Sequence, residues 1–247
     1  MDLVIGTLIL RPYVFIFLGI FLIAGALDLG WRRAVLFGAI VGPVAWLAEF
    51  SSTRTGVPFG LYHYTGLTRG RELYVADVPL MDAASFPFLA YAAFCLARRA
   101  LAPWRPSRPT LALAAGLLMT ALDVVIDPLA VRGDRWFLGR IFYYPAGGVY
   151  FGVPPSNFAG WALVGVVAVG FYLLVAGTHE GRRVWPGVAL YYAVLAFNLA
   201  VTAWIREWTL VGVGATLHVG LALALLYIHA QARRVAGDLR TGEVNPV

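Results

Sequence analysis

Apolar segments long enough to cross a lipid bilayer recur along almost the whole chain. A helix needs about 20 predominantly apolar residues to span the hydrocarbon core. Segments of this kind occupy residues 11–29, 33–50, 79–97, 110–130, 158–177, 187–205 and 209–230. Because only 13% of the residues are charged, against about a quarter in a soluble domain, we predict an all-α polytopic membrane helix bundle. It forms a single integral membrane domain over residues 1–247 with about seven transmembrane helices, or six to eight because the first ten residues are also apolar.

The arginines predict how this bundle is oriented. With seven spans, the loops after the first, third and fifth spans and the C-terminal tail together hold eleven arginines, and the opposite side holds eight. Positive charge favours the cytoplasmic side, so we predict a multi-pass protein of the cell membrane with its N-terminus outside and its C-terminus in the cytoplasm. Arginine pairs at span ends suit anionic lipid headgroups. Membrane lipid therefore accounts for the net charge of +6, and no nucleic-acid partner is expected.

Two long loops, at residues 51–78 and 131–157, combine glycine and proline with many aromatic residues. Glycine and proline disfavour long helices here, while the aromatic residues argue against free solvation. The loops can form an interfacial aromatic belt. Alternatively, residues 56–65 and 142–156 form a lid over a cleft in the bundle. For the second case we expect substrate contacts from Phe59, Tyr62, Tyr64, Trp136, Tyr150, Asn157, Phe158 and Trp161.

Two acids, Asp123 and Asp127, lie within the apolar segment 110–130. Residues four apart share one face of a helix, and a carboxylate in hydrocarbon is expensive unless it is paired, hydrated or protonated. The pair therefore indicates a functional site or, alternatively, a helix-packing role near the helix end that Pro128 marks. Nine of the thirteen acids map to the N-terminal side of the bundle, as do both long loops, so we expect the site there.

The residue types exclude several chemistries. The chain has no lysine, so it cannot form the Schiff base of a retinal protein. Its four histidines lack metal-binding spacing, its single cysteine lies within a span, and no phosphate-binding glycine motif follows a strand. We therefore expect no metal and no cofactor. A membrane prenyltransferase remains a weak alternative, because Asp123 and Asp127 have no second aspartate cluster as partner.

Four stretches together resemble a known family. They are residues 49–64 (EFSSTRTGVPFGLYHY), Val78-Pro79, residues 123–128 (DVVIDP) and residues 148–161 (GVYFGVPPSNFAGW). They are similar to bacterial and archaeal carotenoid-biosynthesis membrane proteins, a family that includes CruF-type carotenoid 1',2'-hydratases and bisanhydrobacterioruberin hydratases. The resemblance covers about residues 30 to 230. It implies a cofactor-independent hydro-lyase that adds water across the terminal double bond of an acyclic carotenoid, giving a tertiary alcohol. Residues 81–86 are less typical of the family, so Asp82 receives no role.

The acids fit this chemistry. Alkene hydration begins with protonation, so one acid must keep its proton near neutral pH. Two carboxyl groups on one helix face achieve this, because one ionises and the other stays protonated. Aromatic faces can stabilise the resulting cation. We assign the acid and base roles to Asp123, Asp127 and Glu49, with Glu49 at a helix end, and water positioning to Asn157, Tyr62 and Tyr150.

Other functions stay open at this point. The same acid chemistry suits a membrane enzyme similar to lycopene cyclases. A non-catalytic protein that binds carotenoid or lipid, or a proton relay through Asp123 and Asp127, is also compatible with the sequence. The expected partners are a lipid-soluble carotenoid and membrane lipid, with other carotenoid-pathway enzymes as candidate protein partners. We expect one elongated, mostly apolar cavity, surrounded by Glu49, Asp123, Asp127, Asn157 and Trp161.

Overall fold

The computed structural model describes residues 2–177 and 183–241, and helices dominate it. Its helices are α1 (Leu3–Leu10), α2 (Pro12–Asp28), α3 (Trp31–Thr55), α4 (Leu80–Leu101), α5 (Arg108–Ala130), α6 (Pro155–Ala176), α7 (Trp185–Trp204) and α8 (Trp208–Thr241). Six of these are long and apolar enough to cross a membrane, and a bent pair, α1 with α2, can be counted as a seventh span. The all-α membrane bundle predicted from hydropathy is therefore confirmed, and the seven predicted spans correspond to α2 through α8.

The first span is broken where α1 meets α2. The two helices bend by 87° at Arg11, directly before Pro12, whose ring cannot continue a helix from the preceding turn. The Arg11 guanidinium donates to both carboxylate oxygens of Glu72, over 2.9 and 2.8 Å, and both side chains are buried. The Leu73 backbone N–H donates to Thr7 Oγ1 at 2.9 Å. The bend is therefore fixed to the segment that precedes α4.

The two long connections are shorter than predicted. Helix α3 continues to Thr55 and ends at Gly56, which takes the left-handed conformation that favours glycine, so the first connection begins at residue 56 and not at 51. Helix α6 begins at Pro155, with Pro154 and Pro155 at its start. The second connection therefore ends at residue 154, and Asn157 lies in the first turn of α6.

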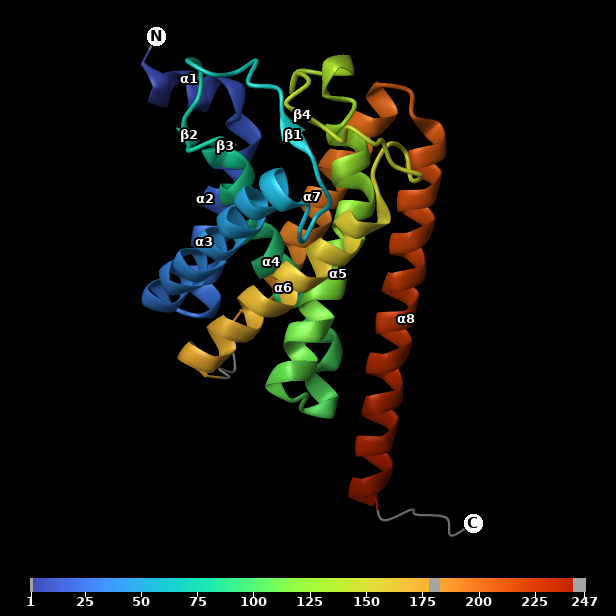
Figure 1. Ribbon diagram of the computed structural model, residues 1–247. Helices are drawn as coiled ribbons and strands as arrows, with labels where there is room; N and C mark the ends of the chain where they lie inside the picture. Colours follow the sequence, from blue (N-terminus) through green and yellow to red (C-terminus); the bar gives the residue numbers. More distant parts are fainter. Residues whose placement is uncertain (1, 178–182, 242–247) are drawn as a thin grey trace.

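Short strands join these connections to each other. Strand β1 (His63–Tyr64) pairs antiparallel with β4 (Phe142–Tyr143), with His63 opposite Tyr143. A second pair, β2 (Tyr74–Val75) with β3 (Val78–Pro79), leads into α4. Figure 1 shows both pairs at the same end of the bundle as α1, while the C-terminal end of α8 lies at the opposite end. The connections thus form one cover over the end of the bundle at which α1 lies, where α3 and α5 end and α4 and α6 begin.

Two helices, α5 and α6, approach each other very closely. A side chain at Gly116 would meet the Ala162 carbonyl oxygen at 2.8 Å, and one at Gly165 would meet the Gly116 backbone at the same distance. Small residues at such crossings let helix backbones pack directly. This contact brings the end of α5, which carries Asp123 and Asp127, beside the first turns of α6. Helix α8 instead lies along the outside of the bundle (Figure 1).

Candidate active site

A pocket lies beneath the cover, between the helices. Its cavity volume is about 130 Å³, and the whole space between the protein atoms that line it, open solvent at its mouth included, is about 930 Å³. Its lining is mainly aromatic and aliphatic, and α2 through α7 and both connections contribute to it. Among the residues that line it are Tyr13, Phe17, Phe59, Tyr62, Tyr64, Phe86, Trp136, Phe142, Tyr144, Trp161 and Phe197. The prediction of a mostly apolar cleft under the connections agrees with this arrangement.

One wall of the pocket is built around Asp127. The Asn157 Nδ2 group donates to Asp123 Oδ2 at 2.7 Å and to Asp127 Oδ2 at 2.8 Å. Trp161 Nε1 donates to the same Asp127 oxygen at 3.1 Å, and the Tyr144 hydroxyl donates to Asn157 Oδ1 at 3.1 Å. The hydrogen bond from Tyr144 fixes the orientation of the Asn157 amide, so both N–H groups of Asn157 donate to the carboxyl groups. Asn157 and Trp161 therefore hold Asp127 in place.

Asp123 lies behind this wall and not in it. Its side chain is fully buried, it is absent from the pocket lining, and its Oδ1 atom has no hydrogen-bond partner among the described residues. Of the five residues expected around one cavity, Glu49, Asp127, Asn157 and Trp161 line the pocket. The expectation is wrong for Asp123, which does not line the pocket and is connected to it through Asn157, a lining residue that donates to both aspartates.

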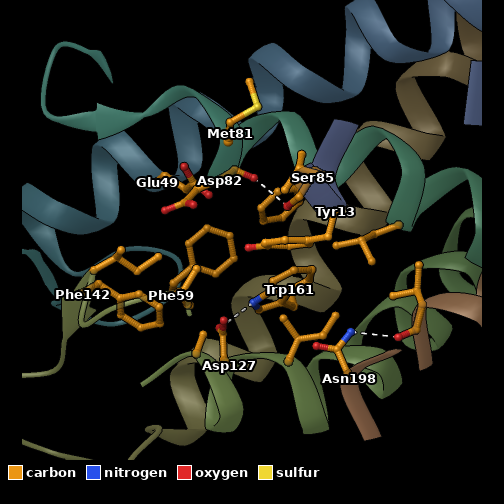
Figure 2. A pocket seen from close by; sticks show the side chains of 18 of the residues that line it. Tyr13, Glu49, Phe59, Met81, Asp82, Ser85, Asp127, Phe142, Trp161 and Asn198 are labelled. Atoms are coloured by element: carbon orange, nitrogen blue, oxygen red, sulfur yellow. Dashed lines mark hydrogen bonds between the residues drawn. The ribbon is translucent and has the colours of Figure 1, made fainter. Parts of the chain in front are cut away.

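The opposite wall carries Glu49 and Asp82. Figure 2 shows both side chains on one side of the pocket, with Asp127 and Trp161 on the other. The two carboxyl groups are near enough for their charged forms to repel each other. The Tyr64 hydroxyl faces both of them, and it donates to Glu49 Oε2 at 3.4 Å. Glu49 lies inside α3, six residues before its end, and not at the helix end that the sequence suggested.

Asp82 is the residue that sequence reasoning missed. It lies in the first turn of α4, where the positive end of the helix dipole favours a negative charge. The available signal was an acid within the apolar segment 79–97, the same signal that singled out Asp123 and Asp127. Its partner Glu49 is 33 positions away in sequence, so the pairing depends on how α3 packs against α4.

Tyrosines from the connections complete this wall. The Tyr62 and Tyr64 hydroxyl groups lie 3.5 Å apart. Burial, followed by the nearby Glu49 charge, raises the pKa of Tyr62 and of Tyr64 well above the ordinary value for a phenol. Burial also raises the pKa of Tyr144. All three phenols therefore keep their protons at any physiological pH and can donate hydrogen bonds.

The four carboxyl groups of the site have no cationic partner in the described parts of the chain. Neither Glu49, Asp82, Asp123 nor Asp127 forms an ion pair there. The cation whose charge Asp82 feels most is Arg11, which is already committed to Glu72 by two hydrogen bonds. Isolated buried charges are expensive, so each pair of acids is expected to retain a proton. Such a site can give and accept protons.

Aromatic faces surround the acids. Trp161 stacks on Phe86 with ring centroids 4.5 Å apart and an angle of 15° between the planes, and Phe59 lies 6.3 Å from Trp161. The ring faces carry negative electrostatic potential, so they attract cations. Of the residues predicted to contact substrate, Phe59, Tyr62, Tyr64, Trp136, Asn157 and Trp161 line the pocket.

Two predicted contact residues lie outside the pocket lining. The Tyr150 hydroxyl donates to the Val124 carbonyl oxygen at 3.2 Å, and Phe158 packs against the Tyr150 ring with centroids 5.3 Å apart. Both residues therefore lie outside this pocket, and the substrate-binding role predicted for them, like the water-positioning role of Tyr150, stays a prediction. The tight turn through Phe151 and Gly152, both at positive φ, directs this part of the connection onto α5 instead.

The fold and the pocket define a class: a multi-pass membrane protein whose helices enclose an aromatic cavity lined by acids that form no ion pair within the described residues. The family model for carotenoid biosynthesis proteins matches residues 5–226, so the chain belongs to the carotenoid biosynthesis protein family, which confirms the resemblance drawn from its motifs. A relative, the bisanhydrobacterioruberin hydratase of Haloarcula japonica, is 29% identical over 233 residues, covering 85% of this chain and 72% of the relative. No solved structure matches the chain.

Proposed function

We propose that this protein is a carotenoid hydratase that adds water across the terminal 1',2' double bond of an acyclic carotenoid. The family and the hydratase named among its relatives support the substrate class and the reaction. The observation that carries the proposal is that Glu49, Asp82 and Asp127 line one aromatic pocket, with Asp123 behind Asp127, and that none of these acids forms an ion pair in the described parts of the chain.

The proposed reaction starts at the wall formed by Glu49 and Asp82. One of these acids keeps a proton because two adjacent negative charges in a buried site are unfavourable. It transfers that proton to the less substituted carbon of the terminal double bond, which leaves a tertiary cation. The faces of Trp161 and Phe86 lie beside the pocket and would stabilise this positive charge.

The second half of the reaction belongs to Asp127. Its Oδ2 atom accepts hydrogen bonds from Asn157 and Trp161, which favours the ionised form. Asp127 would orient a water molecule toward the cation and take one of its protons as the C–O bond forms. Asp123 and Asn157 act through Asp127, so they are positioning residues in this scheme. The proton gained by Asp127 returns to the acid wall through solvent, and the enzyme is restored.

The shape of the pocket suits one end of a long polyene. Figure 2 shows the lining extending from Phe142 at one side to Asn198 at the other. At the Asn198 side the walls come from α2 and α7, where Tyr13 stacks on Phe197 with centroids 5.3 Å apart. We propose that the polyene leaves the pocket here, toward membrane lipid. Other carotenoid-pathway enzymes in the same membrane would supply it, and the pocket would face the non-cytoplasmic side, as the arginine distribution predicts.

Expression in a bacterium that accumulates an acyclic carotenoid tests the proposal. We expect pigments whose mass has increased by one or two waters, depending on whether one or both ends react. Unchanged mass with an altered absorption spectrum would indicate cyclisation, which uses the same cation without water capture. An unchanged pigment would contradict catalysis and favour carotenoid binding or proton transport.

A further inference from the structure

Hydration needs a route by which water reaches the acids, and the mainly apolar pocket does not provide an obvious one. Under the proposed function, each turnover consumes one water molecule and returns one proton to the acid wall. The pocket is mainly apolar, and a bound polyene would occupy its path toward α2 and α7. Water and protons therefore need a second route to Glu49.

A second, polar pocket lies beside the first. It is lined by Thr53, Arg54, His63, Tyr64, Arg69 and Asp77, and we call it the vestibule. Asp77 pairs with Arg54 at 2.9 Å and with Arg69 at 2.5 Å, and these side chains are 38 to 59% exposed. The charged groups tie the end of α3 to the segment between β1 and β3. The vestibule is thus a polar, solvent-exposed hollow held open by surface ion pairs.

One residue, Tyr64, lines both the vestibule and the substrate pocket. Its place is fixed by the pairing of β1 with β4, in which Tyr64 lies opposite Phe142. Its ring packs edge-on against Tyr62 with centroids 5.5 Å apart, and its hydroxyl donates to Glu49. Tyr64 is therefore the wall between the two spaces and also the polar group nearest the acid.

We infer that the vestibule is the entrance for water and protons, separate from the path of the polyene, and that Tyr64 links it to Glu49. A phenol can give its proton to the Glu49 carboxylate while it receives one from a protonated water, a hydronium ion, in the vestibule. Asp127 releases its proton to solvent once the product has left, so the exchange leaves Tyr64 unchanged and replaces the proton that Glu49 and Asp82 gave to the substrate. Water molecules enter by the same route when the Tyr64 ring moves aside. No oxidant or further reactant is needed.

Blocking the vestibule with a thiol reagent tests this inference. The native Cys95 is buried, so a cysteine introduced as Thr53→Cys becomes the accessible thiol in the described region. The purified protein is treated with sulfonatoethyl methanethiosulfonate, and hydration is compared before and after modification of the same sample. The matched control is Val149→Cys, because Val149 lies at the same end, is 88% exposed and lines neither pocket. His63→Cys provides a second vestibule position if Thr53→Cys does not fold.

The expected result is a loss of at least about tenfold in turnover on modification at position 53 or 63, with no loss at position 149. Normal turnover after complete modification, verified by mass, would overturn the inference, and so would a vestibule thiol that does not react. Both contradicting results would be obtained with a variant that hydrates carotenoid before modification, so they would leave the proposed function intact. A protein that shows no hydration before modification would contradict the proposed function itself.

Discussion

Two buried aspartates, one at each end of this bundle, differ in their partners. At the end opposite the cover, the fully buried Asp28 accepts hydrogen bonds from Arg98 at 2.7 and 3.3 Å, with Tyr91 and Cys95 also in contact. At the covered end, Asp127 receives neutral donors from Asn157 and Trp161. Both are aspartates on apolar helices, so residue type alone does not distinguish them. The hydrogen-bond donors around each carboxylate do: arginine for Asp28 and neutral groups for Asp127.

The comparison indicates what each acid is for. A buried carboxylate that is hydrogen-bonded to arginine connects two segments of the chain, because removing either partner leaves an uncompensated charge. The Arg11–Glu72 pair belongs to this kind, and it fixes the bend between α1 and α2. A buried carboxylate that receives only neutral donors can change its protonation state. We therefore propose proton chemistry for the acids that line the pocket and helix association for Asp28.

The largest effect is expected for Asp127→Asn. Asparagine keeps the shape of the side chain but cannot accept a proton from water, so turnover should fall about 1,000-fold while the protein remains folded and membrane-inserted. The matched control is Asp28→Asn, the same change in an arginine-paired acid. It should lower stability by about 3 kcal/mol, measured by thermal unfolding in detergent, with normal turnover per folded molecule. Equal losses of turnover in the two variants would remove the basis of the comparison.

The next effect concerns the acid wall. Glu49→Gln and Asp82→Asn should each reduce turnover about 100-fold, because either change prevents the two acids from sharing a proton. The double variant should be little worse than the more affected single variant, since residues that act as one unit are not additive. Multiplicative losses in single-turnover measurements would show instead that the two acids act independently.

A smaller effect is expected for Tyr64→Phe. This change keeps the ring that separates the vestibule from the pocket and removes only the hydroxyl that donates to Glu49. We expect kcat to fall about tenfold, while the KM for the carotenoid stays unchanged because the apolar lining is preserved. A rise in KM at constant kcat would mean that Tyr64 contacts the substrate and does not carry protons.

The smallest effect is expected at the exposed ion pairs of the vestibule. Hydrogen bonding to Arg69 is the main cause that lowers the pKa of Asp77 from its usual range, with Arg54 adding to it. The charged form of Asp77 is therefore favoured in the folded protein. Its contribution to folding stability is fully present above the ordinary pKa of an aspartate and disappears as the pH falls through the lowered pKa. Solvent screens such pairs. Asp77→Asn should lower the melting temperature slightly at neutral pH and not at all in acid; a difference that grew in acid would contradict this origin.

The sequence predicted the helices well because each one carries its own hydropathy signal. It also predicted that Asn157, Trp161 and Asp127 surround one cavity, and all three line the pocket. Contacts between distant segments could not be predicted this way. The bend at Arg11 depends on Glu72, which lies 61 residues further along the chain, and the role of Asp82 depends on the packing of α3 against α4.

The same limit explains the misplaced residues. The periodicity of α5 places Asp123 and Asp127 on one face, but it does not say that Asn157 lies between Asp123 and the pocket. That arrangement follows from the close crossing of α5 and α6 at Gly116 and Gly165. Likewise, Tyr150 resembles the other connection tyrosines in sequence, yet its hydroxyl bonds to the backbone of α5.

The source of the new oxygen atom tests the central claim most directly. The purified protein is incubated with an acyclic carotenoid in heavy-oxygen water without air, and in a parallel sample in deuterium oxide, and the products are analysed by mass spectrometry and NMR. Protonation by a carboxylic acid followed by water capture predicts labelled oxygen in the tertiary alcohol and one deuteron on the adjacent carbon. Product that forms only with dioxygen or a reductant, or that lacks the solvent label, would contradict the account.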